Sequence, residues 1–496
     1  MRTGFAAGEE EILPTIDAVK RASSGWSGGH PSYGWAQARS WQTNAALLLV
    51  GVGMFLLARQ LVSEYDHYTI GFSGVSGWGS ILYIVACWLV MTQPVNRWTL
   101  PIILVVALAC RLAVLFDAPF LSSDIYRYVW DGVVQHAHIS PYRYVPGDPA
   151  LAFLRAPHRD LFDHINRRNY ARTIYPPVAQ MAFYGITWFS STVTGMKIAM
   201  VMFEGLTMWG LARLLHHLGM RREWTLIYAW CPMLIWEIAG SGHLDSVVMA
   251  FMVLALLARS KGQDGLTGLF LGLAVLTKFY PLVLFPALWR RGDWKMPAVM
   301  AGLAVGSYTV YLSAGRLVFG FLGGYVQEEG MATGERYFLL EWANRLPGLH
   351  GLTERGFLVF AGWVFIVLMV WAWRTGCRRE SGRWEFVLPA LALAMALMLL
   401  FSPHYPWYVA WLVPFLVLTP RWTVATYVMG LFYLCTTALA VGYGPKQYQL
   451  NERLYAWVAI AFMIEAAVFA MPKARAWMLR VIPDPVLAER YAKAKA

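Results

Sequence analysis

Apolar runs long enough to cross a membrane recur along most of this 496-residue chain. The first begins near Thr43 and the last ends near Met471. Each holds roughly 17 to 25 residues, which matches a hydrocarbon core of about 30 Å. Backbone polar groups in lipid must be satisfied within the segment, and this favours helices. We therefore predict an all-α, polytopic membrane protein with about 13–14 transmembrane helices.

The charge balance agrees with this class and argues against a nucleic-acid-binding protein. Hydrophobic residues make up 58% of the chain and charged residues 14%, which is too little polar surface to cover a soluble globule. The net charge of +12 comes mostly from short basic segments between apolar runs, such as Arg221-Arg222. Cytoplasmic connections carry such charge. We expect a lipid bilayer as the surroundings and no nucleic acid as a partner.

The same basic segments predict the topology. Because Arg221-Arg222 must lie inside, only one crossing separates it from the segment after the third apolar run. The apolar helix that opens at Tyr175-Pro176-Pro177 is then surplus, and we expect it to lie along the outer leaflet without crossing. The predicted parts are a cytoplasmic tail at 1–40, a polytopic domain at 41–471 with long external loops at 117–195 and 315–355, and a basic cytoplasmic tail at 472–496.

The run from Leu266 to Trp289 allows two topologies. Basic residues assigned to the inside flank it on both sides, so the segment should go out and return. Pro281 would break a helix and leave two half-helices with Lys278 at an outward-facing tip. The alternative is a single span that violates the charge rule and buries Lys278 at a cost of about 3 kcal/mol.

Unusual polar residues converge on the predicted external side. A helix capped by Ser122 or Ser123 would place Asp124, Arg127 and Asp131 on one face. Polar residues kept at membrane depth are functional candidates, so this convergence predicts an external active site. Four further members of the group follow from the same topology: His243, Asp245, Lys278 and His404.

Asp124 is the candidate catalytic base. It follows a span closely, and one positioned carboxylate suffices to take a proton from a hydroxyl. The alternatives are that it caps its helix or pairs with Arg127 one turn later. Asp131 is better suited to orienting Arg127 or a substrate hydroxyl.

The remaining candidates suit substrate binding. Arg111 lies inside an apolar run near its outer end and would contact a phosphate, an acid of the following helix or the interface. Lys278 is either a point charge for a lipid phosphate or a snorkelling cation. His243 and Asp245 are too few for a metal site and suit a sugar. His404 and Tyr405 would stack on a sugar or an isoprenoid, or belong to an interfacial aromatic belt.

Several blocks together resemble a known family. They are Asp124-Ile-Tyr-Arg127-Tyr-x-Trp-Asp131-Gly132, Pro141-Tyr-Arg-Tyr144, Ile174-Tyr-Pro-Pro177, Gly242-His243-x-Asp245, Lys278-Phe-Tyr280-Pro281 and Ser402-Pro-His404-Tyr405-x-Trp-Tyr408. Their order is similar to that in bacterial polyprenol-phosphate-mannose-dependent mannosyltransferase-like proteins, which are C-class (GT-C) membrane glycosyltransferases. The resemblance implies a GT-C-like fold, Asp124 as the base and Tyr280 among the substrate-binding residues.

The predicted function is transfer of a hexose, with mannose favoured. The resemblance implies an inverting enzyme that uses a polyprenyl-phosphate-linked donor, in the bacterial inner membrane with its site facing the periplasm. A glycan or glycolipid would be the acceptor. We expect no required cofactor. Metal dependence stays open, because external acids such as Glu328 or Glu335 could help to hold a divalent cation. The alternatives are a secondary transporter or flippase of a lipid-linked sugar, and an en bloc oligosaccharide ligase.

Overall fold

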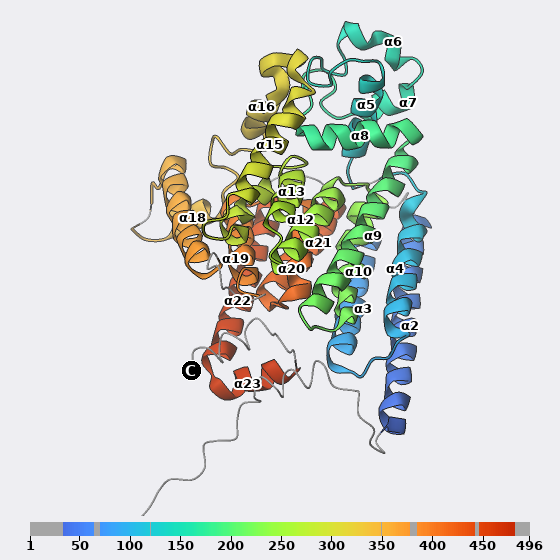
Figure 1. The fold of residues 1–496 in the computed structure, drawn as a ribbon, viewed down its shortest axis with the longest axis vertical. Helices are drawn as coiled ribbons and strands as arrows, with labels where there is room; N and C mark the ends of the chain where they lie inside the picture. The colour runs from blue at the N-terminus through green and yellow to red at the C-terminus, as the bar shows by residue number, and fades with distance from the viewer. Residues whose placement is uncertain are drawn as a thin grey trace, which may run out of the picture.

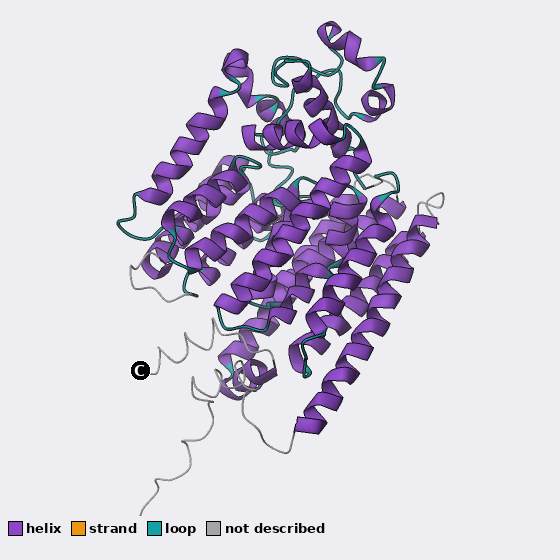
Figure 2. Cartoon of the chain, turned by 45° about the vertical axis from the view of Figure 1, so that its right-hand side comes forward, coloured by secondary structure: helices purple, strands orange, loops and turns teal. Residues whose placement is uncertain are grey.

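The computed structural model describes residues 33–63, 70–119, 121–348, 350–376, 384–441 and 446–481. Within these ranges every regular element is a helix, as Figure 2 shows. The prediction of an all-α, polytopic membrane protein is therefore confirmed. Most of the tail predicted at 1–40, and residues 482–496 of the C-terminal tail, lie outside the described residues.

The helices follow one another with short connections. In chain order they are α2 (Tyr33–Ser63), α3 (Ile70–Thr92), α4 (Thr99–Leu115), α5 (Asp124–His136), η1 (Pro149–Leu151), α6 (Ala152–Arg155), α7 (Arg159–His164), α8 (Pro177–Phe189), α9 (Val193–His217), η2 (Arg222–Thr225), α10 (Leu226–Ala229), α11 (Pro232–Leu234), η3 (Ile235–Gly240), α12 (Asp245–Ser260), α13 (Asp264–Val275), η4 (Tyr280–Leu284), α14 (Phe285–Leu288), α15 (Lys295–Thr309), η5 (Leu312–Phe319), α16 (Leu322–Glu328), α17 (Phe338–Arg345), α18 (Glu354–Gly376), α19 (Val387–Phe401), η6 (Pro406–Leu412), α20 (Val413–Leu418), α21 (Trp422–Val441), α22 (Lys446–Ala470) and α23 (Pro472–Val481).

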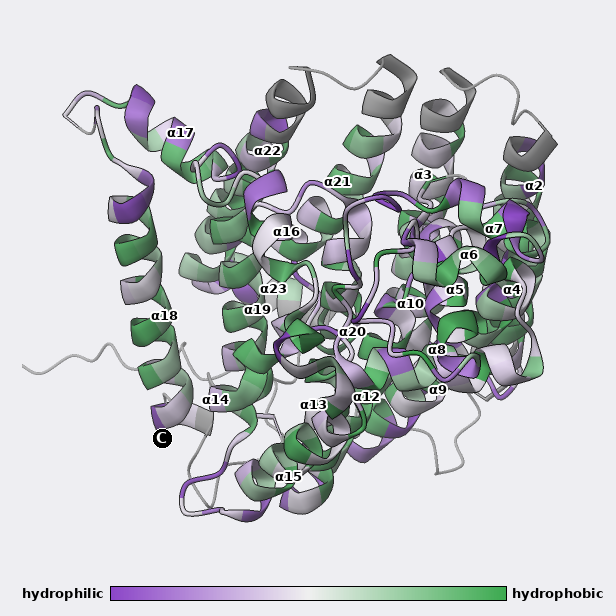
Figure 3. Ribbon diagram, turned by 90° about the horizontal axis from the view of Figure 1, so that it is seen from above, coloured by the Kyte–Doolittle hydropathy of each residue, from purple (hydrophilic) through white to green (hydrophobic). Residues whose placement is uncertain are grey.

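The long helices run side by side as a bundle, with α5 to α8 and α16 gathered at one end and α23 at the other (Figure 1). We call the first the α5 end. Seen from above in Figure 3, the α5–α8 group covers one side of this end, and α17 lies towards the other. Apolar side chains dominate the outer helices, as a bilayer requires: the side chains of α18, for example, are largely exposed.

Among the residues that the structure describes, five helices have the length and composition to cross a membrane, or six if the bent pair α15 with η5–α16 counts as one span. This is fewer than the 13–14 predicted. Five further apolar helices are shorter, with 10–17 residues. The candidate spans lie at Arg39–Gln60, Gly74–Thr92, Val193–His217, Glu354–Thr375 and Glu452–Ala470.

Proline explains much of the shortfall. Pro232 stands at the start of α11, and Pro281 and Pro406 stand in the first turns of η4 and η6. Proline lacks the amide hydrogen that an interior helical position must donate, so it begins helices and interrupts them. Apolar runs that hydropathy treats as single spans are therefore divided into several short helices.

Helix α8 corresponds to the predicted non-crossing helix after Tyr175-Pro176-Pro177. It has 13 residues, fewer than the about 20 that a span needs. In Figure 1 it lies across the bundle. The ring of Phe183 stacks on Tyr128 of α5, with centroids 4.8 Å apart, while Trp188 and Phe189 at its end are exposed. Its length and direction fit a helix that does not cross.

The segment from α13 to α14 is a closed hairpin. At its foot, Arg290 after α14 donates through Nε to Oδ1 of Asp264 at the start of α13, at 2.6 Å, and through a second nitrogen to Gly262 O at 2.9 Å. The two ends of the segment therefore meet. Lys278 lies at the opposite tip, between α13 and η4. This is the two-half-helix arrangement; the alternative single span is absent from the described residues.

Candidate functional site

Asp124 stands at the first turn of α5, at the α5 end of the bundle. Its backbone amide donates to Ser122 Oγ at 3.2 Å, whereas the N-cap residue, Ser123, makes no side-chain cap hydrogen bond. Its carboxylate accepts a hydrogen bond from Asn166 Nδ2 at 3.0 Å. Asp124 remains partly exposed. The carboxylate is thus held at one oxygen and does not form the expected alternative pair with Arg127.

The surroundings of Asp124 set its basicity. Burial raises the pKa of its carboxyl, and Asp245 raises it further. The hydrogen bond from Asn166 and the charges of Lys278 and Arg167 lower this pKa, but burial prevails. A carboxylate with a raised pKa is a stronger base than an ordinary one. These influences also show that Asp124, Asp245 and Lys278 share one electrostatic environment, although they are far apart in sequence.

Lys278 is held in a fixed position at the hairpin tip. Its Nζ lies 2.5 Å from Asp245 Oδ2, and Tyr280 OH donates to the other oxygen of Asp245 at 2.8 Å. Asp245 is fully buried, whereas the Lys278 side chain keeps 15% of its surface accessible. The ammonium group has three donors. One is directed at Asp245, and the accessible part of the group can meet an anion.

Close packing positions α5 against the segment before α12. Gly242 has a φ of +76°, and a Cβ at this position would lie 2.2 Å from Ile125 Cδ1. Both conditions favour glycine. Nearby, buried Lys197 donates to the carbonyl oxygens of Val114 and Asp117, where α4 ends. Ser241 and Gly242 form a buried turn directly after the π-helix η3.

A row of stacked rings forms another part of the site. The His243 ring stacks on Trp407 with centroids 4.2 Å apart, and Trp407 stacks on Tyr405 at 4.5 Å. His243 Nε2 is 3.2 Å from Glu237 Oε2, in a geometry that is not a hydrogen bond, and both atoms lack a hydrogen-bond partner within the described residues. The structure thus brings His243 and Tyr405 together through a residue between them, Trp407.

His404 lies beside this row rather than in it. Its ring is 5.5 Å from that of Phe338, in a tilted contact. Burial, with a smaller contribution from Arg336, lowers its pKa to about 4, so the imidazole is neutral near neutral pH. The turn that carries it is tight: Ser402 has a φ of +46°. His404 therefore packs against the 315–355 segment.

Helix α16 connects the two predicted loops. Glu328 accepts from Arg167 Nε at 2.6 Å, and the neighbouring Glu329 pairs with Arg336. Tyr325 on the same helix contacts the hydroxyl of Tyr408. Arg167 follows Asn166, the partner of Asp124. Sequence reasoning missed these contacts, because they depend on a fold that brings residue 167 to residue 328.

Arg127 and Asp131 form a buried pair that supports α5. Arg127 Nε donates to Asp131 Oδ1 at 2.7 Å, and Arg127 also donates to Ala171 O at 3.1 Å. The second oxygen of Asp131 accepts from Gln180 Nε2 of α8 at 3.0 Å. Asp131 thus orients Arg127, which is one of its two predicted roles. With both side chains almost fully buried, we do not assign them to substrate.

Arg111 is also engaged within the protein. Its guanidinium forms two hydrogen bonds to Glu204, at 2.8 and 2.6 Å, and donates to the carbonyl oxygens of Ala107 and Ala229. The side chains of Arg111 and Glu204 are 1% and 0% exposed. The sequence predicted an acid of the following helix as one possible partner, but the acid present, Glu204, lies on α9 and not on α5. Four of its five N–H donors are used inside the protein and the side chain is buried, so the structure gives no support to the substrate-binding prediction for Arg111.

Metal binding finds no ready site in the described parts of the chain. No group of three or more His, Cys, Asp or Glu side chains there has an arrangement that could hold a metal ion. Glu328, considered above as a candidate for holding a divalent ion, is instead paired with Arg167. Asp245 is similarly neutralised by Lys278.

Replacement of Asn166 by alanine should remove the hydrogen bond that the Asp124 carboxylate accepts. The hydrogen bond from Asn166 lowers the pKa of Asp124, so its loss should raise this pKa and move the acid limb of the kcat/KM profile to higher pH. A hydrogen bond of about 1 kcal/mol corresponds to a roughly fivefold loss in kcat/KM. The measurement is a pH–rate profile with Arg159→Gln as the control, since Arg159 forms an exposed ion pair in the same segment. An unchanged acid limb would contradict the assignment.

Comparison with known proteins gives one family. Residues 46–290, about half of the chain, match the MptA_B family model, described as alpha-(1->6)-mannopyranosyltransferase, N-terminal domain. The matched range contains Asp124, Asp245 and Lys278 and ends at the foot of the hairpin. Comparison with curated proteins and with solved structures finds no match.

Proposed function

We propose that this chain, whose residues 46–290 match the alpha-(1->6)-mannopyranosyltransferase family model, transfers mannose from a polyprenyl-phosphate-linked donor to a glycan or glycolipid acceptor. The family supplies the coarse activity, mannosyl transfer. The donor, the acceptor and inversion at the anomeric carbon are the finer parts of the proposal. So is the location, a bacterial inner membrane with the α5 end facing the periplasm.

One observation carries the proposal: a partly exposed carboxylate, Asp124, shares its electrostatic environment with an accessible cation, Lys278, which a buried acid holds in place. Transfer to a hydroxyl requires a base for the acceptor proton and a stabilising charge for the leaving phosphate. Asp124 supplies the base and Lys278 supplies the stabilising charge. In the aromatic row, His243 and Trp407 are buried, and the partly exposed Tyr405 is the member that offers a ring face for a sugar.

The proposed reaction is a single displacement. The acceptor oxygen attacks the anomeric carbon of the donor while Asp124 takes the hydroxyl proton. The bond between the anomeric carbon and the phosphate oxygen breaks, and polyprenyl phosphate leaves with that electron pair. Lys278 stabilises the charge that develops on the phosphate. Attack from the face opposite the leaving group inverts the anomeric configuration.

The test uses the purified full chain in lipid vesicles with polyprenyl-phosphate mannose and α-(1→6)-mannobiose. The expected product is one hexose longer, with an anomeric configuration inverted relative to the donor. Lys278→Met should strongly reduce this product. Lys295→Met, at the exposed first residue of α15, should not. Movement of the donor across the vesicle membrane without a new glycosidic bond would favour the flippase. Transfer of an intact oligosaccharide from a lipid carrier would favour the ligase.

A further inference from the structure

Helix α16 and the turn before it dock onto the loop between α7 and α8. The backbone amide of Phe321 donates to Thr173 O at 3.3 Å, and the ring of Phe321 meets that of Tyr170 edge-on, with centroids 5.7 Å apart. At the other end of α16, Glu328 pairs with Arg167, which lies 161 residues away in sequence. Main-chain, ring and charge contacts therefore join the two predicted external loops at the α5 end (Figure 1).

A glycine makes the close approach of the two backbones possible. Gly320 has a φ of +55°, and a Cβ at this position would lie 1.6 Å from Thr173 O. A residue with a side chain could not occupy this place without separating the two segments. Thr173 is itself fixed, because its Oγ1 accepts from Gln180 Nε2 of α8 at 2.7 Å. The docked arrangement thus depends on residues of both segments.

The loop between α7 and α8 has an unusual backbone conformation at the point where Glu328 holds it. Arg167 has a φ of +54°, in the left-handed region, which residues with a side chain keep only where their surroundings hold them. Its carbonyl accepts from the amide of Ala171 at 3.0 Å, and its Nε donates to Glu328 Oε2 at 2.6 Å. The preceding residue, Asn166, donates to Asp124 Oδ1 at 3.0 Å. The conformation of Arg167 therefore determines where the Asn166 amide points.

We propose that Glu328 is a positioning residue for the base of the reaction: by holding Arg167, it keeps Asn166 hydrogen-bonded to Asp124. The proposal rests on the function proposed above and adds to it a residue beyond the matched range of 46–290. The side chains of Arg167 and Glu328 keep 33% and 30% of their surface accessible, and pairs so exposed contribute little to the free energy of unfolding. Loss of the pair should therefore affect the base more than the stability of the fold.

A double-mutant cycle with Asn166 tests the proposal. The pH dependence of kcat/KM is measured for the full chain in lipid vesicles, with polyprenyl-phosphate mannose and α-(1→6)-mannobiose. Glu328→Gln should lower kcat/KM about fivefold, as expected for Asn166→Ala. It should also move the acid limb to higher pH, because the hydrogen bond that lowers the pKa of Asp124 is lost. In a chain that already carries Asn166→Ala, Glu328→Gln should cause no further loss.

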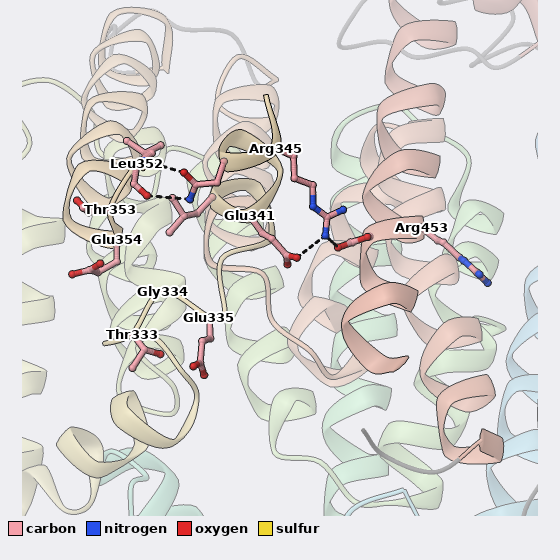
Figure 4. Close-up of a pocket in the computed structure, with 12 residues that line it drawn as sticks. Thr333, Gly334, Glu335, Glu341, Arg345, Leu352, Thr353, Glu354 and Arg453 are labelled. Carbon is pink, nitrogen blue, oxygen red and sulfur yellow. Dashed lines mark hydrogen bonds and ion pairs between the residues drawn. The ribbon is translucent and has the colours of Figure 1, made fainter. Parts of the chain in front are cut away.

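The direction of the pH shift separates positioning from a simple charge effect. Removing the charge of Glu328 without any movement would leave the acid limb unchanged or move it to lower pH, because a nearby anion raises the pKa of a carboxyl. That result, or additive losses in the double variant, would overturn the proposal. The matched control is Glu341→Gln, since Glu341 pairs with Arg345 on α17 (Figure 4). It should keep the kcat/KM and the acid limb of the unmodified chain.

Hydrogen exchange, measured by mass spectrometry, reports on the same contact without turnover. Glu328→Gln should accelerate exchange of the amides between α7 and α8, whereas Glu341→Gln should leave it unchanged. Equal exchange in the two variants would contradict the positioning role. A failure of the proposed function is distinguishable, because it would appear as absence of mannosyl transfer by the unmodified chain while the difference in exchange persists.

Discussion

Replacement of Asp124 by asparagine should reduce mannosyl transfer by about 10²- to 10⁴-fold, the usual contribution of a positioned general base. Asparagine preserves the size of the side chain and can still contact Asn166, but it cannot take a proton from the acceptor. The measurement is turnover of the purified protein in vesicles with saturating donor and acceptor. KM for the donor should change little, since the donor phosphate is assigned to Lys278.

The control for this experiment is Asp160→Asn, an exposed acid in α7 of the same segment. It should retain normal turnover. Because burial raises the pKa of Asp124, the unmodified chain should lose activity at a higher pH than an ordinary carboxylate would allow. The base works when ionised, so activity is present above that pKa and is lost as the pH falls through it. Near-normal turnover of Asp124→Asn would remove it from the base role.

Arg111→Met should destabilise the protein strongly, by about 3–5 kcal/mol, while leaving the catalytic constellation in place. The substitution strands Glu204, a carboxylate with no exposure, inside the bundle. Removing both charges should be far milder, because two apolar side chains of similar volume replace a pair that is costly to desolvate. Arg111→Met with Glu204→Leu should therefore recover most of the lost stability. Thermal unfolding in detergent micelles measures both variants.

The same double variant tests whether Arg111 contacts the donor. If the guanidinium serves only the bundle, the double variant should keep the KM of the unmodified protein for polyprenyl-phosphate mannose. A large increase in this KM, in a protein of recovered stability, would restore the phosphate contact. Single and double variants of a pair so close are not additive, and the difference between them measures the coupling of Arg111 to Glu204.

The sequence predicted those features that depend on charge and periodicity. Hydropathy indicated the membrane class, and the basic residues around Leu266–Trp289 indicated a segment that goes out and returns. The clasp between Asp264 and Arg290 supplies the physical basis for that return. The described residues contain fewer helices of full span length than the sequence predicted, because hydropathy averages across prolines such as Pro232 that end one helix and begin another.

Side-chain partners were predicted less well, since they depend on tertiary packing. Arg111 had three possible contacts in the sequence, and its actual partner, Glu204, was not among them, because that pair follows from the position of α9 beside α4. Asn166 lies 42 residues after Asp124, in a segment without periodicity, so no local pattern connects the two. The pairing of Asp131 with Arg127 could be predicted from the sequence, because residues four apart share a helical face.

On the function proposed above, the short hairpin gives the membrane itself a part in the reaction. Helix α13 has 12 residues and is about 18 Å long, against a hydrocarbon thickness of about 30 Å. With its foot at one surface, the hairpin brings Lys278 only part of the way to the opposite headgroups. A lipid-borne phosphate must then be drawn inwards, or the bilayer thinned, for the two charges to meet. Turnover would therefore depend on the acyl-chain length of the surrounding lipids.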